Sequence, residues 1–312
     1  MAGDSVVLDE VRKGFGAVRA VDGLSLRVPA GCIYGLLGPN GAGKTTILRM
    51  IMDILRPDSG RIEVLGAPSA GLAKHRVGYM PEEKGLYRKM TVGGTLRYFG
   101  AIKGLAAHDL AARVPRWLQR IGLDAWAGRK VEELSRGMHQ KLQFAVTCIS
   151  DPELLILDEP FSGLDPVNVD LLKGIVLGLR GEGKTVIFST HAMHEAEELC
   201  DFLVLINRGR VVFDGTLETI RSGWPVGAVQ ARLVGETAFL EGLPMVKGVT
   251  RAGAKVEIAL ADGADPQELL AALVGRLRVE AFEVKVPSLH EIFVRLVGEA
   301  PSEGSARDPR FL

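Results

Sequence analysis

The fold of this chain is decided by the stretch Gly38-Pro39-Asn40-Gly41-Ala42-Gly43-Lys44-Thr45. An apolar run over residues 32–37 predicts a buried strand before it, and a helical pattern over residues 45–55 follows it. A Gly-rich turn that ends in Lys-Thr between a strand and a helix matches the phosphate-binding P-loop. The glycines let backbone amides turn toward a polyphosphate, and the helix start adds unpaired donors and a positive dipole end. We therefore expect this stretch and the following Thr46 to bind nucleotide phosphates, with Lys44 as a cation and Thr45 as a Mg²⁺ ligand.

Two carboxylates follow a second apolar strand, residues 154–157. Asp158 and Glu159 then lie at the carboxyl end of a buried strand, where a doubly wound sheet places its ligands. We expect Asp158 to hold Mg²⁺ through water and Glu159 to polarise the attacking water, as phosphoryl transfer requires. His191 ends another apolar strand, residues 187–190, and is expected at the same edge, within reach of the γ-phosphate.

Strand and helix patterns alternate through most of the chain, which indicates an α/β fold with a mostly parallel sheet covered on both faces. Short strands are expected at residues 5–8 and 24–28, and these N-terminal strands pair antiparallel. Between about residues 90 and 150 the apolar period becomes helical, which predicts an inserted helical subdomain. Residues 1–223 are therefore expected to form one ATP-binding domain.

The character of the sequence changes after residues 221–225, where shorter and less apolar strands begin. Residues 226–298 predict a small α+β domain of βαββαβ order, with a helix opened by Asp265-Pro266. The polar residues 299–312 are expected to be a flexible tail.

Composition excludes some classes of function. The chain has 38 Lys and Arg residues and 38 Asp and Glu residues, so it lacks the basic excess that phosphate-backbone binding needs, and no nucleic-acid partner is expected. Its longest apolar runs fall far short of the ~20 residues that cross a bilayer, and its N-terminus does not resemble a secretory signal. We expect a cytoplasmic protein.

Three further motifs accompany the P-loop and the Asp-Glu strand: Leu134-Ser135-Arg136-Gly137-Met138 before a helix, Ser162-Gly163-Leu164-Asp165, and Ser189-Thr190-His191. With these five motifs in order, residues 1–220 resemble the nucleotide-binding subunit of the ABC transporter family. The resemblance implies an ATPase that forms a head-to-tail homodimer or heterodimer. ATP would lie between the P-loop of one subunit and the signature of the other, with Ser135, Gly137 and Asp165 as binding residues. Phe15 stands where the family has an aromatic ring that stacks on adenine.

The sequence departs from the family pattern at two places. The signature reads Leu-Ser-Arg-Gly-Met where Leu-Ser-Gly-Gly-Gln is usual, so Arg136 adds bulk and charge. Glu82 replaces the usual Gln and brings a third carboxylate, which we include among the candidate Mg²⁺ ligands.

Residues 81–87 and 287–296 are similar to those of ABC-2-type export ATPases, such as sodium or drug efflux ATPases with a small C-terminal domain. That resemblance implies a separate integral-membrane permease, docked on residues 83–90 and the helical insertion at the cytoplasmic face of the membrane. The C-terminal domain would either stabilise a dimer or sense a ligand.

The main alternative is a soluble ABC ATPase that acts on ribosomes or DNA. Those relatives carry two ATPase domains in one chain, zinc-finger insertions or long coiled coils, and this sequence shows none of these. A P-loop kinase or GTPase would need neither the signature nor the Ser-Gly-Leu-Asp loop. A non-hydrolysing regulator is disfavoured by the presence of both Asp158 and Glu159.

Overall fold

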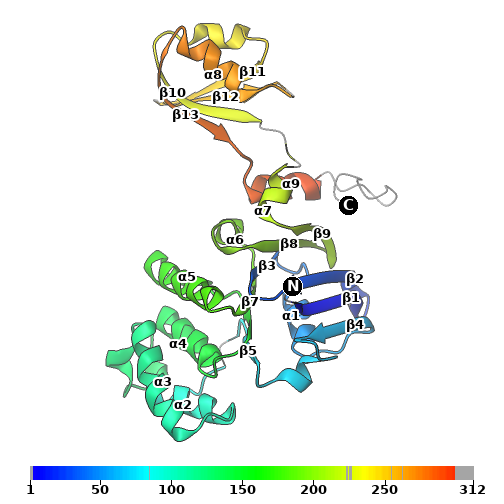
Figure 1. The fold of residues 1–312 in the computed structure, drawn as a ribbon, viewed down its shortest axis with the longest axis vertical. Helices are drawn as coiled ribbons and strands as arrows, with labels where there is room; N and C mark the ends of the chain where they lie inside the picture. Colours follow the sequence, from blue (N-terminus) through cyan, green and yellow to red (C-terminus); the bar gives the residue numbers. More distant parts are fainter. Residues whose placement is uncertain are drawn as a thin grey trace. The chain divides into compact units, whose positions relative to one another are not determined.

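The computed structural model describes residues 3–83, 85–222, 224, 227–253, 255–261 and 263–298. It divides into two compact units, Met1–Thr216 and Leu217–Leu312 (Figure 1). The division falls before the helix α7 (Leu217–Ser222), so this helix belongs to the second unit, whereas the sequence placed the boundary after it. The expected flexible tail, residues 299–312, lies outside the described residues.

A six-stranded sheet forms the centre of the first unit, with the strand order β5-β6-β7-β3-β8-β9. Five neighbouring strands run parallel, and β9 pairs antiparallel with β8. All residues of β3, β6 and β7 are buried, because both faces of the sheet are covered. This confirms the expected mostly parallel sheet. The strands are β3 (Ile33–Leu37), β5 (Val77–Met80), β6 (Leu154–Asp158), β7 (Thr185–Thr190), β8 (Phe202–Asn207) and β9 (Arg210–Gly215).

The two faces of this sheet bury separate apolar clusters. One cluster joins the sheet to the helices α2, α3, α4 and α5, and the other joins it to α1 and the N-terminal sheet, as Figure 1 shows. The helices α2 to α4 occupy the stretch between β5 and β6, as expected for an inserted helical subdomain. The helices are α1 (Lys44–Ile51), α2 (Val92–Ile102), α3 (Ala107–Arg120), α4 (Arg136–Cys148), α5 (Pro166–Gly181) and α6 (Met193–Leu199), with short 3-10 helices at Ala70–Ala73, Asp124–Trp126 and Val131–Glu133.

The N-terminal sheet has the antiparallel order β2-β1-β4, built from β1 (Asp4–Phe15), β2 (Val18–Pro29) and β4 (Ser59–Val64). The first two strands have 12 residues each, so the expected short strands were wrong in length. The β1–β2 pairing contains register shifts, as at Leu8/Val11. Such irregularities interrupt the alternation of apolar and polar residues, and only fragments of each strand show it in the sequence.

The helix after the P-loop also ends earlier than expected. α1 stops at Ile51, and Asp53 adopts a left-handed backbone conformation with φ 56°. A single left-handed residue terminates a helix. The helix therefore ends before residue 55, the predicted end of the helical pattern.

The second unit contains an antiparallel sheet in the order β11-β12-β10-β13. Its elements are α7, β10 (Ala228–Val234), a 3-10 helix (Ala238–Gly242), β11 (Val246–Ala252), β12 (Lys255–Leu260), α8 (Pro266–Val274), β13 (Arg278–Lys285) and α9 (Leu289–Gly298). The βαββαβ order is confirmed, although its first helix is only a 3-10 turn. Leu240 of that turn is nevertheless fully buried in the core of the unit. Asp265 caps α8 by accepting a hydrogen bond from the Gln267 backbone amide at 2.8 Å.

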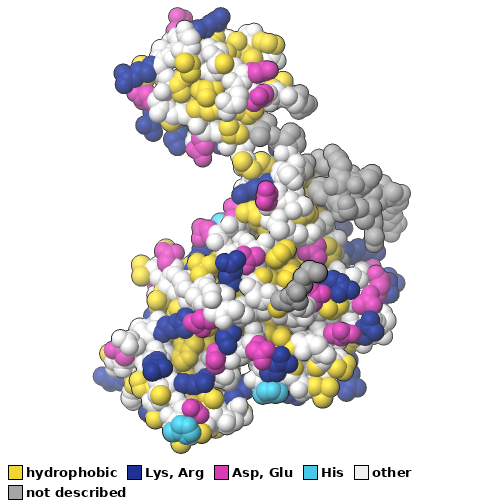
Figure 2. All heavy atoms as spheres, in the orientation of Figure 1, with side chains coloured by type: hydrophobic (Ala, Val, Ile, Leu, Met, Phe, Trp, Pro, Cys, Tyr) yellow, Lys and Arg dark blue, Asp and Glu magenta, His cyan; other side chains and the backbone are white. Residues whose placement is uncertain are grey.

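Basic and acidic side chains are interspersed over the visible face of both units, consistent with the balanced charge (Figure 2). Within the described ranges, no helix combines the length and apolar character that crossing a bilayer requires.

Candidate nucleotide site

The P-loop connects the end of β3 to the start of α1, and two of its glycines have conformational reasons to be glycine. Gly43 precedes α1 with φ 108°, and a Cβ there would lie 2.4 Å from the carbonyl oxygen of Ala20. Gly41 has φ 79°, and a Cβ there would meet no atom within 4 Å. The left-handed turn thus needs glycine. At Gly41 its backbone borders open space, where a phosphate can approach.

Lys44 connects this loop to the carboxylates of Asp158 and Glu159. Its side chain is only 7% exposed. Its Nζ donates to the carbonyl oxygens of Gly38 (2.7 Å) and Pro39 (3.3 Å) and lies 3.8 Å from Oε1 of Glu159. Burial lowers the pKa of Lys44, while the charges of Glu159 and Asp158 oppose that shift. A cation held between a phosphate loop and two carboxylates fits a bound polyphosphate.

Asp158 is the last residue of β6 and is 1% exposed. Its Oδ1 accepts hydrogen bonds from Ser189 Oγ (2.5 Å) and Thr45 Oγ1 (3.3 Å). Its Oδ2 is buried and has no hydrogen-bond partner among the described residues. An unsatisfied buried carboxylate oxygen is costly unless another group binds it. Because hard cations prefer carboxylate and hydroxyl oxygens, Asp158 and Thr45 fit a Mg²⁺ ion.

Glu82 is less closely connected to this pair. It is exposed, and its recorded effect on the site is electrostatic, because its charge raises the pKa of Lys44. Among the described residues there is no group of three or more His, Cys, Asp or Glu side chains arranged to hold a metal. The role of Glu82 as a metal ligand stays a prediction.

Glu159 and His191 form a close pair. Nδ1 of His191 lies 3.0 Å and 3.1 Å from the two carboxylate oxygens of Glu159, and the imidazole side chain is 57% exposed. The carboxylate can only accept, so this contact requires the proton on Nδ1. The backbone of Glu159 is left-handed with φ 50°, and its amide donates to Ser189 Oγ at 3.0 Å. A non-glycine residue in this conformation stores strain, which is characteristic of functional sites.

Buried polar residues that the sequence analysis did not select support this edge. From α4, Nε2 of Gln140 donates to the carbonyl oxygens of Glu159 (3.4 Å) and Pro160 (3.1 Å). Nε2 of Gln143 donates to the carbonyl oxygens of Pro81 (2.7 Å) and Glu83 (3.2 Å). Their signal in the sequence is two glutamines three residues apart in a helix that is mostly buried. α4 thus connects the signature at its start to the catalytic segment.

The signature residues lie at the N-terminus of α4. Ser135 caps this helix, and its Oγ accepts from the backbone amide of Met138 at 3.3 Å. Asp165 caps α5 in the same way, and hydrogen bonds from Asn168 lower the pKa of this carboxyl. Among the residues that the structure describes, no hydrogen bond or ion pair joins Ser135 or Gly137 to residues 38–46. One chain therefore presents two separate groups of predicted nucleotide ligands.

Phe15 ends β1 and leaves half of its surface exposed, with Lys13 Nζ 5.7 Å from the ring centroid. A free aromatic face of this kind can stack on a base.

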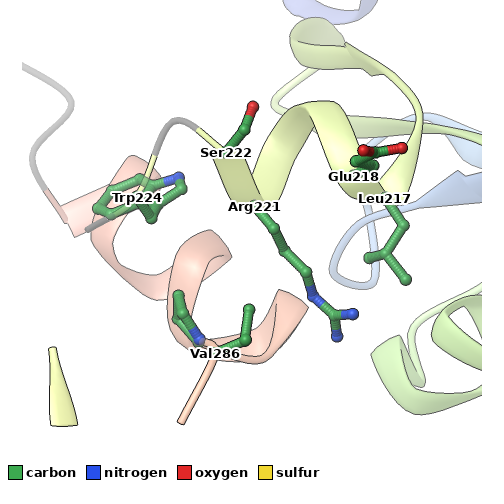
Figure 3. A pocket seen from close by; sticks show the side chains of 7 residues that line it. Leu217, Glu218, Arg221, Ser222, Trp224 and Val286 are labelled. Carbon is green, nitrogen blue, oxygen red and sulfur yellow. The ribbon is translucent and has the colours of Figure 1, made fainter. Parts of the chain in front are cut away.

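Each unit also carries a hollow. A groove of about 220 Å³ in the first unit is lined by residues of β5 and the segment after it and of α2 and α4, including Tyr79, Leu86, Phe99 and Gln143. A shallow depression of about 620 Å³ in the second unit is lined by residues of α7, Trp224, Val286 and Pro287. Figure 3 shows the Arg221 side chain extending from α7, with Trp224 and Val286 among the other residues that line the depression.

Two family models match the sequence. The model described as "ABC transporter" matches residues 21–162, which include the P-loop, the signature and Asp158-Glu159. The model described as "ATP-binding protein DrrA1-3-like, C-terminal domain" matches residues 215–297, nearly the whole second unit that the structure describes.

Several curated proteins are similar over almost the entire chain. The "Uncharacterized ABC transporter ATP-binding protein YhaQ" of Bacillus subtilis is 42% identical over 296 residues, which cover 94% of this chain and 98% of that protein. The "Nod factor export ATP-binding protein I" of Rhizobium sp. (strain N33) is 37% identical, with coverage of 94% and 97%. The "Daunorubicin resistance ATP-binding protein DrrA3" of Streptomyces coeruleorubidus is 34% identical, with coverage of 96% and 98%.

Among solved structures, an ATP-binding subunit of an ABC transporter aligns with a TM-score of 0.65 and 30% identity, covering 70% of this chain and 92% of that one. CbiO1 from Clostridium perfringens, described as part of the ABC transporter complex CbiONQ, aligns with a TM-score of 0.63 and 25% identity, covering 70% and 91%.

Proposed function

This chain belongs to the ABC transporter ATP-binding proteins, and we propose that it powers export of a solute through a separate membrane-spanning subunit. As a member of that family it binds ATP and hydrolyses it in transport. Export is supported by two relatives that match nearly the full chain and whose names state Nod factor export and daunorubicin resistance.

The observation that supports the chemistry best is the meeting of Lys44, Asp158, Glu159 and His191 at one sheet edge. Thr45 and Asp158 would hold Mg²⁺, which supplies charge neutralisation at the phosphates when bound. Lys44 would bind a phosphate oxygen and stay in place through its bonds to Gly38 and Pro39.

Glu159 would accept the proton of the attacking water. The His191 Nδ1–H holds its carboxylate, which leaves Nε2 of His191 free to face the substrate. Nζ of Lys44 lies 3.8 Å from Oε1 of Glu159, so the P-loop cation and the proposed proton acceptor are neighbours at this edge.

The working assembly requires two ATPase subunits. The signature residues Ser135 and Gly137 lie at the start of a 13-residue helix whose unpaired amides can bind an anion. Among the described residues, neither makes a hydrogen bond or ion pair with the P-loop of its own chain. We propose that they complete the site of a second subunit, head to tail, whether that is another copy of this chain or a paralogue. ATP binding then closes the pair, and hydrolysis releases it.

We propose that the membrane subunit docks at the groove formed by α2, α4 and the segment after β5. Leu86, Phe99 and Ile102 give this groove an apolar lining. Tyr87 and Tyr98 lie beside Phe99, with ring centroids 6.1 Å and 5.4 Å from that of Phe99, and they are 54% and 40% exposed. Exposed aromatic rings next to an apolar groove are typical of protein interfaces. Docking there would place the ATPase at the cytoplasmic face of the membrane.

The mechanism is tested with Glu159→Gln. This substitution keeps the shape of the side chain but removes the proton acceptor, so we expect a protein that binds ATP, hydrolyses it at least about 100-fold more slowly and accumulates as an ATP-bound dimer. The matched control is Glu182→Gln, because Glu182 is a half-exposed glutamate whose ion pair with Arg120 is 3.9 Å long. Turnover by Glu159→Gln at the rate of the control would refute Glu159 as the base.

A further inference from the structure

Arg136 is an unusual residue for its position in the signature, where glycine is usual. It is the first residue of α4 and is exposed. Its side chain nevertheless has a defined position, because a Cβ added to Gly163 would lie 2.5 Å, 2.7 Å and 2.9 Å from its Nε, Cζ and Nη2 atoms. The guanidinium therefore lies directly against Gly163 of the loop after β6. Gly163 is also left-handed, with φ 74°, a backbone conformation that strains any side chain at that position.

The charge of Arg136 is held in place without being neutralised. The two acids just before the signature have other partners: Glu133 pairs with Arg129 at 3.5 Å and Glu132 with Lys130 at 3.7 Å. In the part of the chain that the structure describes, no carboxylate lies within 4.0 Å of the Arg136 guanidinium. Packing alone would be satisfied by an uncharged side chain of the same length.

On the basis of the head-to-tail dimer proposed above, we propose that Arg136 binds the triphosphate of the ATP held by the opposite subunit, with Gly163 of its own chain fixing its direction. Arg136 stands between the two signature residues expected at that ATP and adds a full charge to the positive end of α4. A guanidinium binds phosphate oxygens through two parallel hydrogen bonds. The unusual signature of this chain thus makes ATP-driven closure dependent on an arginine charge.

The experiment compares Arg136 variants in the Glu159→Gln background, where hydrolysis does not consume the ATP. Arg136→Met keeps an unbranched stem that can cover Gly163 but removes the charge, and Arg136→Lys keeps the charge without the planar fork. Sedimentation velocity gives the ATP concentration for half-maximal dimer at 50, 150 and 300 mM NaCl. Binding of a fluorescent ATP analogue to dilute monomer and the thermal midpoint serve as controls for the chain's own P-loop and its folding.

We expect Arg136→Met to require about tenfold more ATP, as loss of a charge-assisted hydrogen bond implies. Its ATP requirement should also depend less on salt than that of the parent, which is the Glu159→Gln protein with Arg136 intact. Arg136→Lys should fall between the two, and analogue binding by the monomer should not change. If Arg136→Met dimerised at the parental ATP concentration with the parental salt dependence, the inference would be overturned while the dimer remained.

A parent protein that stays monomeric with ATP would instead refute the head-to-tail dimer, and this inference with it. The orientation by Gly163 has its own test. Gly163→Ala must displace Arg136 and strain the loop, so we expect it to raise the ATP requirement more in the parent than in the Arg136→Met protein. Equal effects in both would show that Gly163 does not direct Arg136.

Discussion

Replacing Ser189 by Ala should damage both the stability and the catalysis of this ATPase, because one buried hydroxyl holds the Asp158 carboxylate and the backbone of Glu159. Ser189 is fully buried in β7. Its Oγ donates to Asp158 Oδ1 at 2.5 Å and accepts the amide of Glu159 at 3.0 Å. Alanine would leave a buried charge with one hydrogen bond fewer and a buried amide without its acceptor.

The magnitude follows from these two contacts. A hydrogen bond to a charged group contributes about 1.5–3 kcal/mol, and an unsatisfied buried amide costs about 1–3 kcal/mol. The two losses share one relaxed cavity and are not additive, so we expect the free energy of unfolding to fall by about 2–4 kcal/mol. The left-handed Glu159 also loses the contact that holds its backbone, and a displaced base should lower kcat roughly 10- to 100-fold.

The assay pairs urea denaturation with ATPase kinetics and uses Thr185→Val as the matched control. Thr185 lies on the same strand and is 2% exposed. Its hydroxyl contacts Ser5 Oγ at 2.8 Å and accepts the Gly31 amide at 2.9 Å, at the end of the strand away from Ser189. The control should lose stability and keep kcat. A Ser189→Ala protein with the kcat of the control would refute the reasoning.

Three further predictions concern the same domain. Lys44→Ala should abolish ATP turnover and weaken ATP binding at least about tenfold, measured by calorimetry, because the buried cation of the P-loop is lost; binding at full strength would contradict its role. Burial raises the pKa of Glu195 above its ordinary value of 4.5, although a hydrogen bond from Thr190 opposes the shift. The stability that the raised pKa contributes is therefore complete below pH 4.5 and is lost as pH rises through the pKa of the folded protein. Glu195→Gln imitates the protonated form and should therefore gain stability relative to the wild type in urea denaturation as pH rises from 4.5 to 7, whereas parallel curves would contradict the shift. Tyr87→Ala should reduce recovery of the membrane subunit in pull-downs without changing the ATPase rate of the isolated protein, and an intact complex would count against the proposed docking groove.

The sequence was sufficient for the P-loop, the parallel sheet and the positions of Asp158, Glu159 and His191. These features depend on contiguous motifs at the ends of fully buried strands, where the sequence pattern and the topology agree. The P-loop–carboxylate contacts then follow, because neighbouring parallel strands end at the same edge.

Other features depend on tertiary contacts that no local pattern encodes. The register shifts in β1 and β2 broke the alternation by which their length could be predicted. The hydrogen bonds of Ser189, Gln140 and Gln143 link residues far apart in the chain. The packing of Arg136 on Gly163 is likewise visible only once the fold brings the start of α4 beside the loop after β6.

Affinity purification from gently solubilised native membranes tests most directly whether this ATPase works on a membrane-spanning partner. The tagged, full-length chain would be captured in the presence and absence of ATP, and the proteins that accompany it would be identified and quantified. We predict recovery of a polytopic membrane protein in stoichiometric amount. Recovery with ribosomes, with DNA or with no partner at all would contradict the claim and favour a non-transport ABC ATPase.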